Sequence, residues 1–139
     1  MKVLIDTSVW SLALRKKTLT GDEKKTVNEL KELIKEFRAV IIGPVRQELL
    51  SGISQAEKYE MLKDKLKYFE DMAINSEDYE KASELYNICR KNGIQGSHID
   101  FLICAVSINR NISIFSTDKD FFEFSKVIPV RIHSVRNNL

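Results

Sequence analysis

The stretch that most constrains the fold is Lys2–Ser8, in which the apolar run Val3–Ile5 is followed by small polar residues. A short, fully apolar run is typical of a buried strand in a parallel sheet that helices cover on both faces. Asp6 then lies at the carboxyl end of this strand, the edge at which open α/β sheets bind ligands. Taken alone, Asp6, Thr7 or Ser8 is more simply interpreted as the cap of the following helix.

Further strands and helices are predicted to alternate along the chain. The helix over residues 22–37 has an apolar stripe that includes Phe37. Right-handed crossovers between the strands then give a three-layer α/β/α sandwich around a parallel sheet. Residues 72–74 fit either a short strand or an extended linker. The other predicted strands are 39–42, 112–116 and 127–132, the last at an edge because of Pro129; the other predicted helices are 8–14, 45–52, 55–69, 76–92, 99–109 and a short one through Ser125.

Composition sets broader limits on the chain. Its 139 residues, 43% of them hydrophobic, suit a single domain over residues 1–139. No apolar run approaches the roughly 20 residues of a membrane span, so we expect no membrane contact. Cys89 and Cys104 fall among apolar residues of predicted helices without metal-ligand spacing, which favours reduced core thiols and a cytoplasmic protein.

Four acidic residues share one kind of position in the predicted fold. Asp6 and Asp118 each follow a strand, and Glu48 and Asp100 lie in the early turns of helices. In a parallel sheet, these positions meet at the carboxyl edge. Clustered carboxylates repel one another, and oxygen ligands of this kind suit Mg²⁺ or Mn²⁺, which activate water for phosphodiester hydrolysis. Each acid alone is more simply explained as solvated or as a helix cap.

The charge balance is compatible with a nucleic-acid substrate. The chain has 22 Lys and Arg against 20 acidic residues, so gathering four acids in one pocket leaves 16 acids on the remaining surface. A negative pocket within a positive surface suits a polyanion that brings its phosphate to metal ions. An ordinary mixed surface explains the same composition.

The four acids stand in an ordered set of motifs that spans nearly the whole chain. These are Asp6-Thr7-Ser8-Val9-Trp10, Glu48-Leu49-Leu50-x-Gly52, Asp100-Phe101-Leu102-Ile103-Cys104-Ala105 and Thr117-Asp118-Lys119-Asp120-Phe121. With these motifs the chain resembles PIN-domain ribonucleases, and most closely the VapC-type toxins of toxin–antitoxin pairs.

The resemblance implies a metal-dependent endoribonuclease that forms a homodimer and is inhibited by a partner antitoxin. It assigns the metal-site acids to Asp6, Glu48, Asp100 and Asp118. Supporting polar residues would be Thr7, Ser8 and Thr117. Phe101 departs from the family pattern because it is bulkier than the usual small residue after the third acid.

Other functions fit the sequence less well. A haloacid-dehalogenase-like phosphatase needs a second acid where Ser8 stands, and a receiver domain needs paired acids that are absent. A non-catalytic binding module on the same fold would not need all four acids. A housekeeping role in RNA processing remains an alternative among PIN-domain nucleases. His98 and His133 lack ligand spacing.

Asp118 and Asp120 both follow the predicted strand 112–116, and either could be the metal-site residue there. Asp118 is closer to the carboxyl edge, so we assign it to the metal site. Asp120 follows Thr117 by three residues, which is the capping-box spacing. We therefore predict that Thr117 caps the short helix, with Asp120 as its partner and an outer supporter of the metal site.

Overall fold

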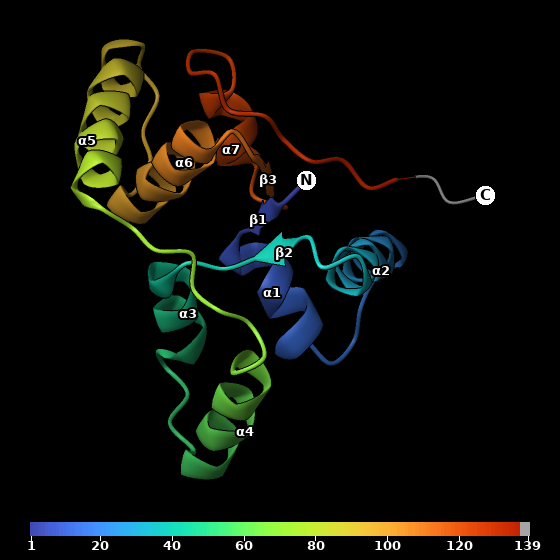
Figure 1. Ribbon diagram of the computed structural model, residues 1–139. Coiled ribbons are helices and arrows are strands. Elements are labelled where there is room, and N and C mark those ends of the chain that lie inside the picture. Colours follow the sequence, from blue (N-terminus) through green and yellow to red (C-terminus); the bar gives the residue numbers. More distant parts are fainter. Residues whose placement is uncertain (137–139) are drawn as a thin grey trace.

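The computed structural model describes residues 1–136, in which short strands lie among helices (Figure 1). The order of elements confirms the predicted α/β alternation and the α/β/α architecture. The elements are β1 (Val3–Ile5), α1 (Thr7–Leu14), α2 (Gly21–Lys35), β2 (Ala39–Val40), α3 (Gly43–Leu50), α4 (Ala56–Leu66), α5 (Ser76–Lys91), α6 (His98–Arg110), β3 (Ser113–Phe115) and α7 (Lys119–Phe124).

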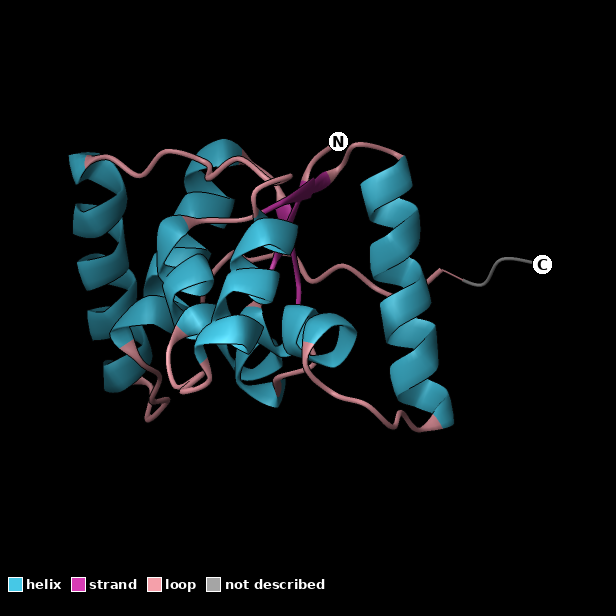
Figure 2. Ribbon diagram, turned by 90° about the horizontal axis from the view of Figure 1, so that it is seen from below, coloured by secondary structure: helices cyan, strands magenta, loops and turns pink. Residues whose placement is uncertain are grey.

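The sheet of the described residues is parallel and has the strand order β2-β1-β3. Val3 of β1 is in register with Ala39 on one side and with Ser113 on the other. Seen from two directions, α5 and α6 lie on one side of the strands and α2 on the other (Figures 1 and 2). The first strand of the chain is therefore central, and its carboxyl end lies between those of its two neighbours.

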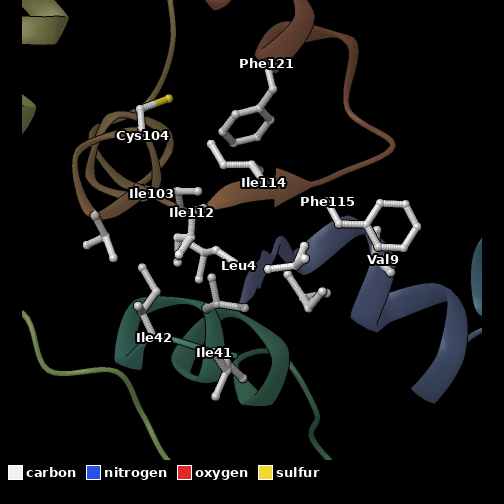
Figure 3. Packing of buried hydrophobic residues seen from close by; sticks show 14 of the residues in the cluster. Leu4, Val9, Ile41, Ile42, Ile103, Cys104, Ile112, Ile114, Phe115 and Phe121 are labelled. Carbon is white, nitrogen blue, oxygen red and sulfur yellow. The ribbon is translucent and has the colours of Figure 1, made fainter. Parts of the chain in front are cut away.

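The core forms where the three strands meet the helices. All three residues of β1 have no exposed surface, as the apolar run predicted. Leu4 lies among Ile103 of α6, Ile114 of β3 and Ile42 after β2 (Figure 3). Helix α6 is buried from Phe101 through Ser107, which explains why every residue of this stretch except Ser107 is apolar. This packing fixes the strand ends from which the acidic residues project.

Capping side chains start three of the helices. Thr20, Asn75 and Ser97 each accept a hydrogen bond from the backbone of the third helical residue, whose acidic side chain bonds back. Such reciprocal boxes satisfy two backbone donors at each helix start. Helix α2 ends at Lys35, and Phe37, with φ 58°, turns the chain toward β2. The prediction that Phe37 belongs to the buried stripe is wrong, because its side chain is 85% exposed.

Residues 127–132 do not form the predicted last strand. Of these residues, only Ile132 pairs with the sheet, through one isolated bridge to Ile114 of β3. Pro129 has no N–H to donate, and the chain turns through Ser125–Ile128 with short-range hydrogen bonds instead. The segment 72–74 is an extended linker, preceded by a single bridge between Ile41 and Asp71. No helix within residues 1–136 is long and apolar enough to cross a membrane.

Candidate active site

Asp6 lies directly after β1 and is also the N-cap of α1. Its Oδ2 accepts hydrogen bonds from the Ser8 backbone N–H (3.3 Å) and Ser8 Oγ (2.8 Å). A third hydrogen bond comes from Ser116 Oγ (2.8 Å). Only 6% of the residue is exposed. The carboxylate is therefore held by neutral donors at the carboxyl edge of the sheet.

Ser8 and Ser116 connect Asp6 to the segment that carries Asp118. Ser8 Oγ lies 3.2 Å from Ser116 Oγ and accepts the Thr117 backbone N–H at 3.0 Å. The Asp118 N–H donates to Ser116 Oγ at 2.9 Å. Ser116 is the one member of this network that the sequence analysis did not single out. The sequence feature that could have identified Ser116 is its place directly after the apolar strand β3, which matches the place of Asp6 directly after β1.

The predicted capping box at α7 is wrong. The cap is Asp118, whose Oδ1 accepts the backbone N–H of Asp120 at 2.9 Å, and the helix begins at Lys119. Thr117 lies one residue before the cap, and its backbone N–H, which a capping box would donate to Asp120, donates to Ser8 Oγ instead. Asp120 is thus the second helical residue, with an exposed side chain.

Asp100 is the third residue of α6 and forms a capping box with Ser97. Its Oδ2 accepts the Ser97 N–H at 3.0 Å, and its own N–H donates to Ser97 Oγ at 3.0 Å. Burial raises the pKa of this carboxyl, and the negative charges of Asp6 and Asp118 raise the pKa further. The three aspartates are therefore close enough to repel one another.

Glu48 reaches the same edge from α3. Its Oε1 accepts a hydrogen bond from Thr7 Oγ1 at 2.8 Å, and Thr7 directly follows Asp6. Glu48 is exposed, in contrast to Asp6. The carboxylates nevertheless do not converge: within residues 1–136, no group of three or more acidic, His or Cys side chains is gathered tightly enough to hold a metal ion. Asp118 instead caps α7, and Asp100 bonds back to Ser97, the cap of α6.

The lack of a counter-charge at Asp6 sets it apart from other buried acids. Glu29 and Asp78 are also buried, and each faces a cation. Arg136 and His133 bind Glu29, and Arg110 binds Asp78 at 2.7 Å. Asp6 has no Lys, Arg or His partner in the described part of the chain. Hard oxygen ligands with uncompensated negative charge have the donor chemistry that Mg²⁺ or Mn²⁺ prefers, whereas the side chains within residues 1–136 are not arranged as a closed metal site.

The remaining candidate side chains lie outside this edge. His133 bonds Glu29, and His98 stacks on Tyr86 with 5.2 Å between ring centroids. Cys89 and Cys104 are buried, free thiols, as predicted. Burial raises the pKa of the Cys104 thiol, so it stays protonated and unreactive at neutral pH.

The chain shares its fold with several solved structures. FitAcB from Neisseria gonorrhoeae is 18% identical, covers 95% of this chain and 96% of its own, and has a TM-score of 0.76. VapBC2 from Rickettsia felis, bound to a promoter DNA fragment, is 21% identical over 96% of this chain and 98% of its own, with a TM-score of 0.72. A toxin–antitoxin complex from Klebsiella pneumoniae is 16% identical over 94% of this chain and 100% of its own, with a TM-score of 0.64.

Sequence comparison extends this likeness to a family. No curated protein matches the chain significantly. The model of the PIN domain, in contrast, matches residues 3–127, which include Asp6, Glu48, Asp100 and Asp118. The match covers nearly the whole chain, so the protein belongs to the PIN domain family.

Proposed function

We propose that this protein is a metal-dependent endoribonuclease and the toxin of a toxin–antitoxin pair. The observation that carries the proposal is Asp6, a carboxylate 6% exposed that only neutral donors bind. A buried charge without a partner is costly, so such a site favours a bound cation. Membership of the PIN family and a fold shared with toxin–antitoxin complexes support the proposal.

Asp6, Asp100, Asp118 and Glu48 are the residues that would hold Mg²⁺ or Mn²⁺. The ion supplies activation of water and neutralisation of charge at the scissile phosphate. Ser8 and Ser116 hold the Asp6 carboxylate, and the Ser8 contact to the Thr117 N–H ties Asp6 to the start of α7. Thr7 orients Glu48, and Asp120 has an outer supporting role.

RNA is the substrate that we assign to this edge. The excess of Lys and Arg over the acids that remain outside the edge attracts a polyanion to the surface. The acidic edge repels the same polyanion unless a cation is bound. Phosphodiester cleavage and metal binding are therefore coupled in this proposal.

Cleavage of RNA by the purified chain tests the metal-site assignment. We expect cleavage with Mg²⁺ or Mn²⁺ and none with a chelator. Asp6→Asn and Asp100→Asn should each lower turnover by roughly 100-fold or more, because each removes a charged ligand. Asp64→Asn is the matched control, since Asp64 is an exposed acid of α4. Calorimetry should show weaker metal binding in the two site variants alone, and near-normal turnover in either would overturn the assignment.

The toxin role requires a partner that blocks the acidic edge. We expect an antitoxin that inserts a basic side chain, most simply Arg, whose planar fork pairs with two carboxylate oxygens. Isolation of the protein from its native host should return a small partner protein that inhibits cleavage. A nuclease recovered without such a partner would instead indicate housekeeping RNA processing, and a partner without any cleavage would indicate a non-catalytic binding module.

We also propose that the protein is a homodimer and that apolar helix surface forms the contact. The exposed side of α5 includes Tyr79, which is 57% exposed. Contact through this side leaves the acidic edge open to RNA. Light scattering that finds only monomer at high protein concentration would contradict this part of the proposal.

A further inference from the structure

A groove lies between the end of α1 and one face of α4. Its volume is about 350 Å³. Half of its lining residues are apolar, the other half are cationic, and none is acidic. The apolar residues are Leu14, Ile53, Met61 and Leu62, and the cations are Arg15, Lys17, Lys58 and Lys65. The groove therefore combines apolar surface with positive charge of a single sign.

The cations of this groove lack counter-charges. Lys16 and Lys67, which are close to them in the sequence, form ion pairs with Glu23 and Asp64. Within residues 1–136, by contrast, no carboxylate pairs with any of the cations that line the groove. All of these cations are exposed, so their charges are open to a ligand from solution. The groove is therefore suited to an anion with several charges.

Helix α1 connects this groove to the acidic edge. It begins at Thr7, directly after Asp6, and ends at Leu14 in the groove. In Figure 1, α1 and α3 both run from the strands toward α4. At 1.5 Å per residue, the groove is about 10 Å from Thr7 along the helix axis. A stacked single strand covers that distance in roughly three nucleotides, since it advances about 3.4 Å with each one.

The composition of the groove favours single-stranded RNA over a protein partner. Lys58, Lys65 and Lys17 line it, whereas Lys is depleted in the buried centre of protein–protein interfaces. Interfaces with nucleic acids are strongly positive, and grooves for single strands place cations along the backbone. The lining contains no aromatic ring on which a base could stack. We therefore assign the groove to the phosphates of the RNA and not to the choice of a base.

We infer that this groove binds the RNA backbone roughly three nucleotides from the cleaved linkage. The inference rests on the proposed RNA cleavage and says where the substrate is held. The acidic edge repels phosphate, so the cations of the groove supply the attraction that brings the strand to it. Lys58 and Lys65 are then positioning residues, which govern RNA affinity and KM but not the chemical step.

The salt dependence of RNA binding tests the phosphate contacts. Protein carrying Asp6→Asn is titrated in chelator with a labelled single strand of about 12 nucleotides, a length within the range of known single-strand sites. Lys58→Gln with Lys65→Gln should flatten the slope of log K against log salt by about 1.4, since each phosphate contact contributes about 0.7. At about 0.1 M salt, the same slopes correspond to roughly 25-fold weaker binding.

The matched control is Lys81→Gln with Lys91→Gln, which removes the same charge from α5. Because these residues do not line the groove, the control should change the affinity by less than about twofold, as expected of screened charges at a distance. Equal effects of the two pairs of substitutions would overturn the inference, because the groove would then contribute only to the net charge.

The methyl signal of Met61 locates the bound strand. The chain has 3 Met residues, and Met61 is 56% exposed in the groove, whereas Met72 lines a pocket beside β2. In chelator, the RNA should shift the Met61 signal and leave that of Met72 in place. An unshifted Met61 signal contradicts the inference. So does a shift that a Glu- and Leu-rich helical peptide produces and RNA does not, because the groove would then be a protein-docking surface.

These outcomes separate the inference from the proposed function. Binding and NMR need no cleavage, so they support an RNA groove even if the chain cuts no RNA. Where cleavage occurs, Lys58→Gln with Lys65→Gln should raise KM by roughly 25-fold at unchanged kcat, in line with the loss of two phosphate contacts. Cleavage with unchanged KM, or a loss of kcat alone, would leave the nuclease in place and overturn the inference.

Discussion

At the scale of single residues, buried acids differ in what their charge contributes to stability. Asp78 has no exposed surface and accepts hydrogen bonds from Arg110, Asn109 and the Asn75 backbone. Asp6 is nearly as buried but has only hydroxyl and backbone donors. The charge of Asp78 therefore faces a cation, whereas the charge of Asp6 is met by neutral donors alone.

Matched Asp→Asn variants should separate these two cases. Asp78→Asn should lower the free energy of unfolding by about 2–4 kcal/mol, because it leaves Arg110 without its counter-charge. With a chelator present, Asp6→Asn should change it by less than about 1 kcal/mol, because no cation loses its partner. Denaturant titration measures both values. Equal losses would show that Asp6 does have a compensating charge.

The pH dependence of stability should follow Asp78. The Arg110 guanidinium beside Asp78 holds the pKa of that carboxyl well below its usual range, whereas in the unfolded chain the pKa is about 3.9. The unfolded state therefore takes up the proton first, so this contribution is complete above about pH 5 and is lost as the pH falls. The gap in melting temperature between wild type and Asp78→Asn should narrow from pH 6 to pH 3. A constant gap would contradict the assignment.

At the scale of elements, local patterns predicted most of the fold. The apolar run Val3–Ile5 predicted β1. The positions of Pro and Gly residues predicted several helix boundaries to within a few residues. The prediction failed at residues 127–132, because an apolar run has the same sequence pattern whether or not it can pair with a neighbouring strand. It also failed at α7, where Asp118 and Thr117 were both plausible caps. Hydrogen bonds across more than 100 residues, such as Thr117 N–H to Ser8, decided that choice, and no local pattern encodes them.

The loop before α6 should be intolerant of any side chain at Gly96. A Cβ there would lie 2.5 Å from Phe124 Cζ and 3.0 Å from Phe101 Cε2. Gly96→Ala should therefore lower the free energy of unfolding by about 1–3 kcal/mol through overpacking. It should also lower cleavage, because Phe124 belongs to the helix that Asp118 caps.

Gly21 is the control for this prediction, since a Cβ there would meet nothing within 4 Å. Gly21→Ala lies at the start of α2 and should stabilise the protein by about 0.4–1 kcal/mol. Calorimetric melting of both variants measures the contrast. If the two changes have the same effect, the close approach at Gly96 does not limit the loop.

At the scale of the whole molecule, the final described residues tie the chain back to α2. Glu29 Oε2 lies 2.6 Å from His133 Nε2 and accepts Arg136 Nε at 2.7 Å. Arg136 also forms two hydrogen bonds of 3.0 Å to Glu36. Hydrogen bonds to Glu36 and Glu29 raise the pKa of the Arg136 guanidinium. Residues 133–136 are therefore part of the folded unit that carries the sheet.

Removal of this connection should cost more than removal of a nearby surface arginine. Arg136→Gln leaves the buried Glu29 with His133 alone and should lower the free energy of unfolding by about 2 kcal/mol. Arg131→Gln loses only contacts to the exposed Asn111 and should cost less than about 1 kcal/mol. Denaturant titration measures both, and limited proteolysis should trim the Arg136 variant faster. Equal stabilities would show that the connection to α2 does not hold residues 133–136 in place.

The position of β1 at the centre of the sheet has a consequence for synthesis on the ribosome. Asp6 is synthesised 110 residues before its hydrogen-bond partner Ser116, and Asp118 follows Ser116. At 5–20 residues per second, the ribosome needs roughly 6–22 s to add those residues, and the acidic edge is incomplete until then. The RNA cleavage that we propose would therefore require a chain that already contains Ser116 and Asp118. The proposed antitoxin would be needed only from that moment on.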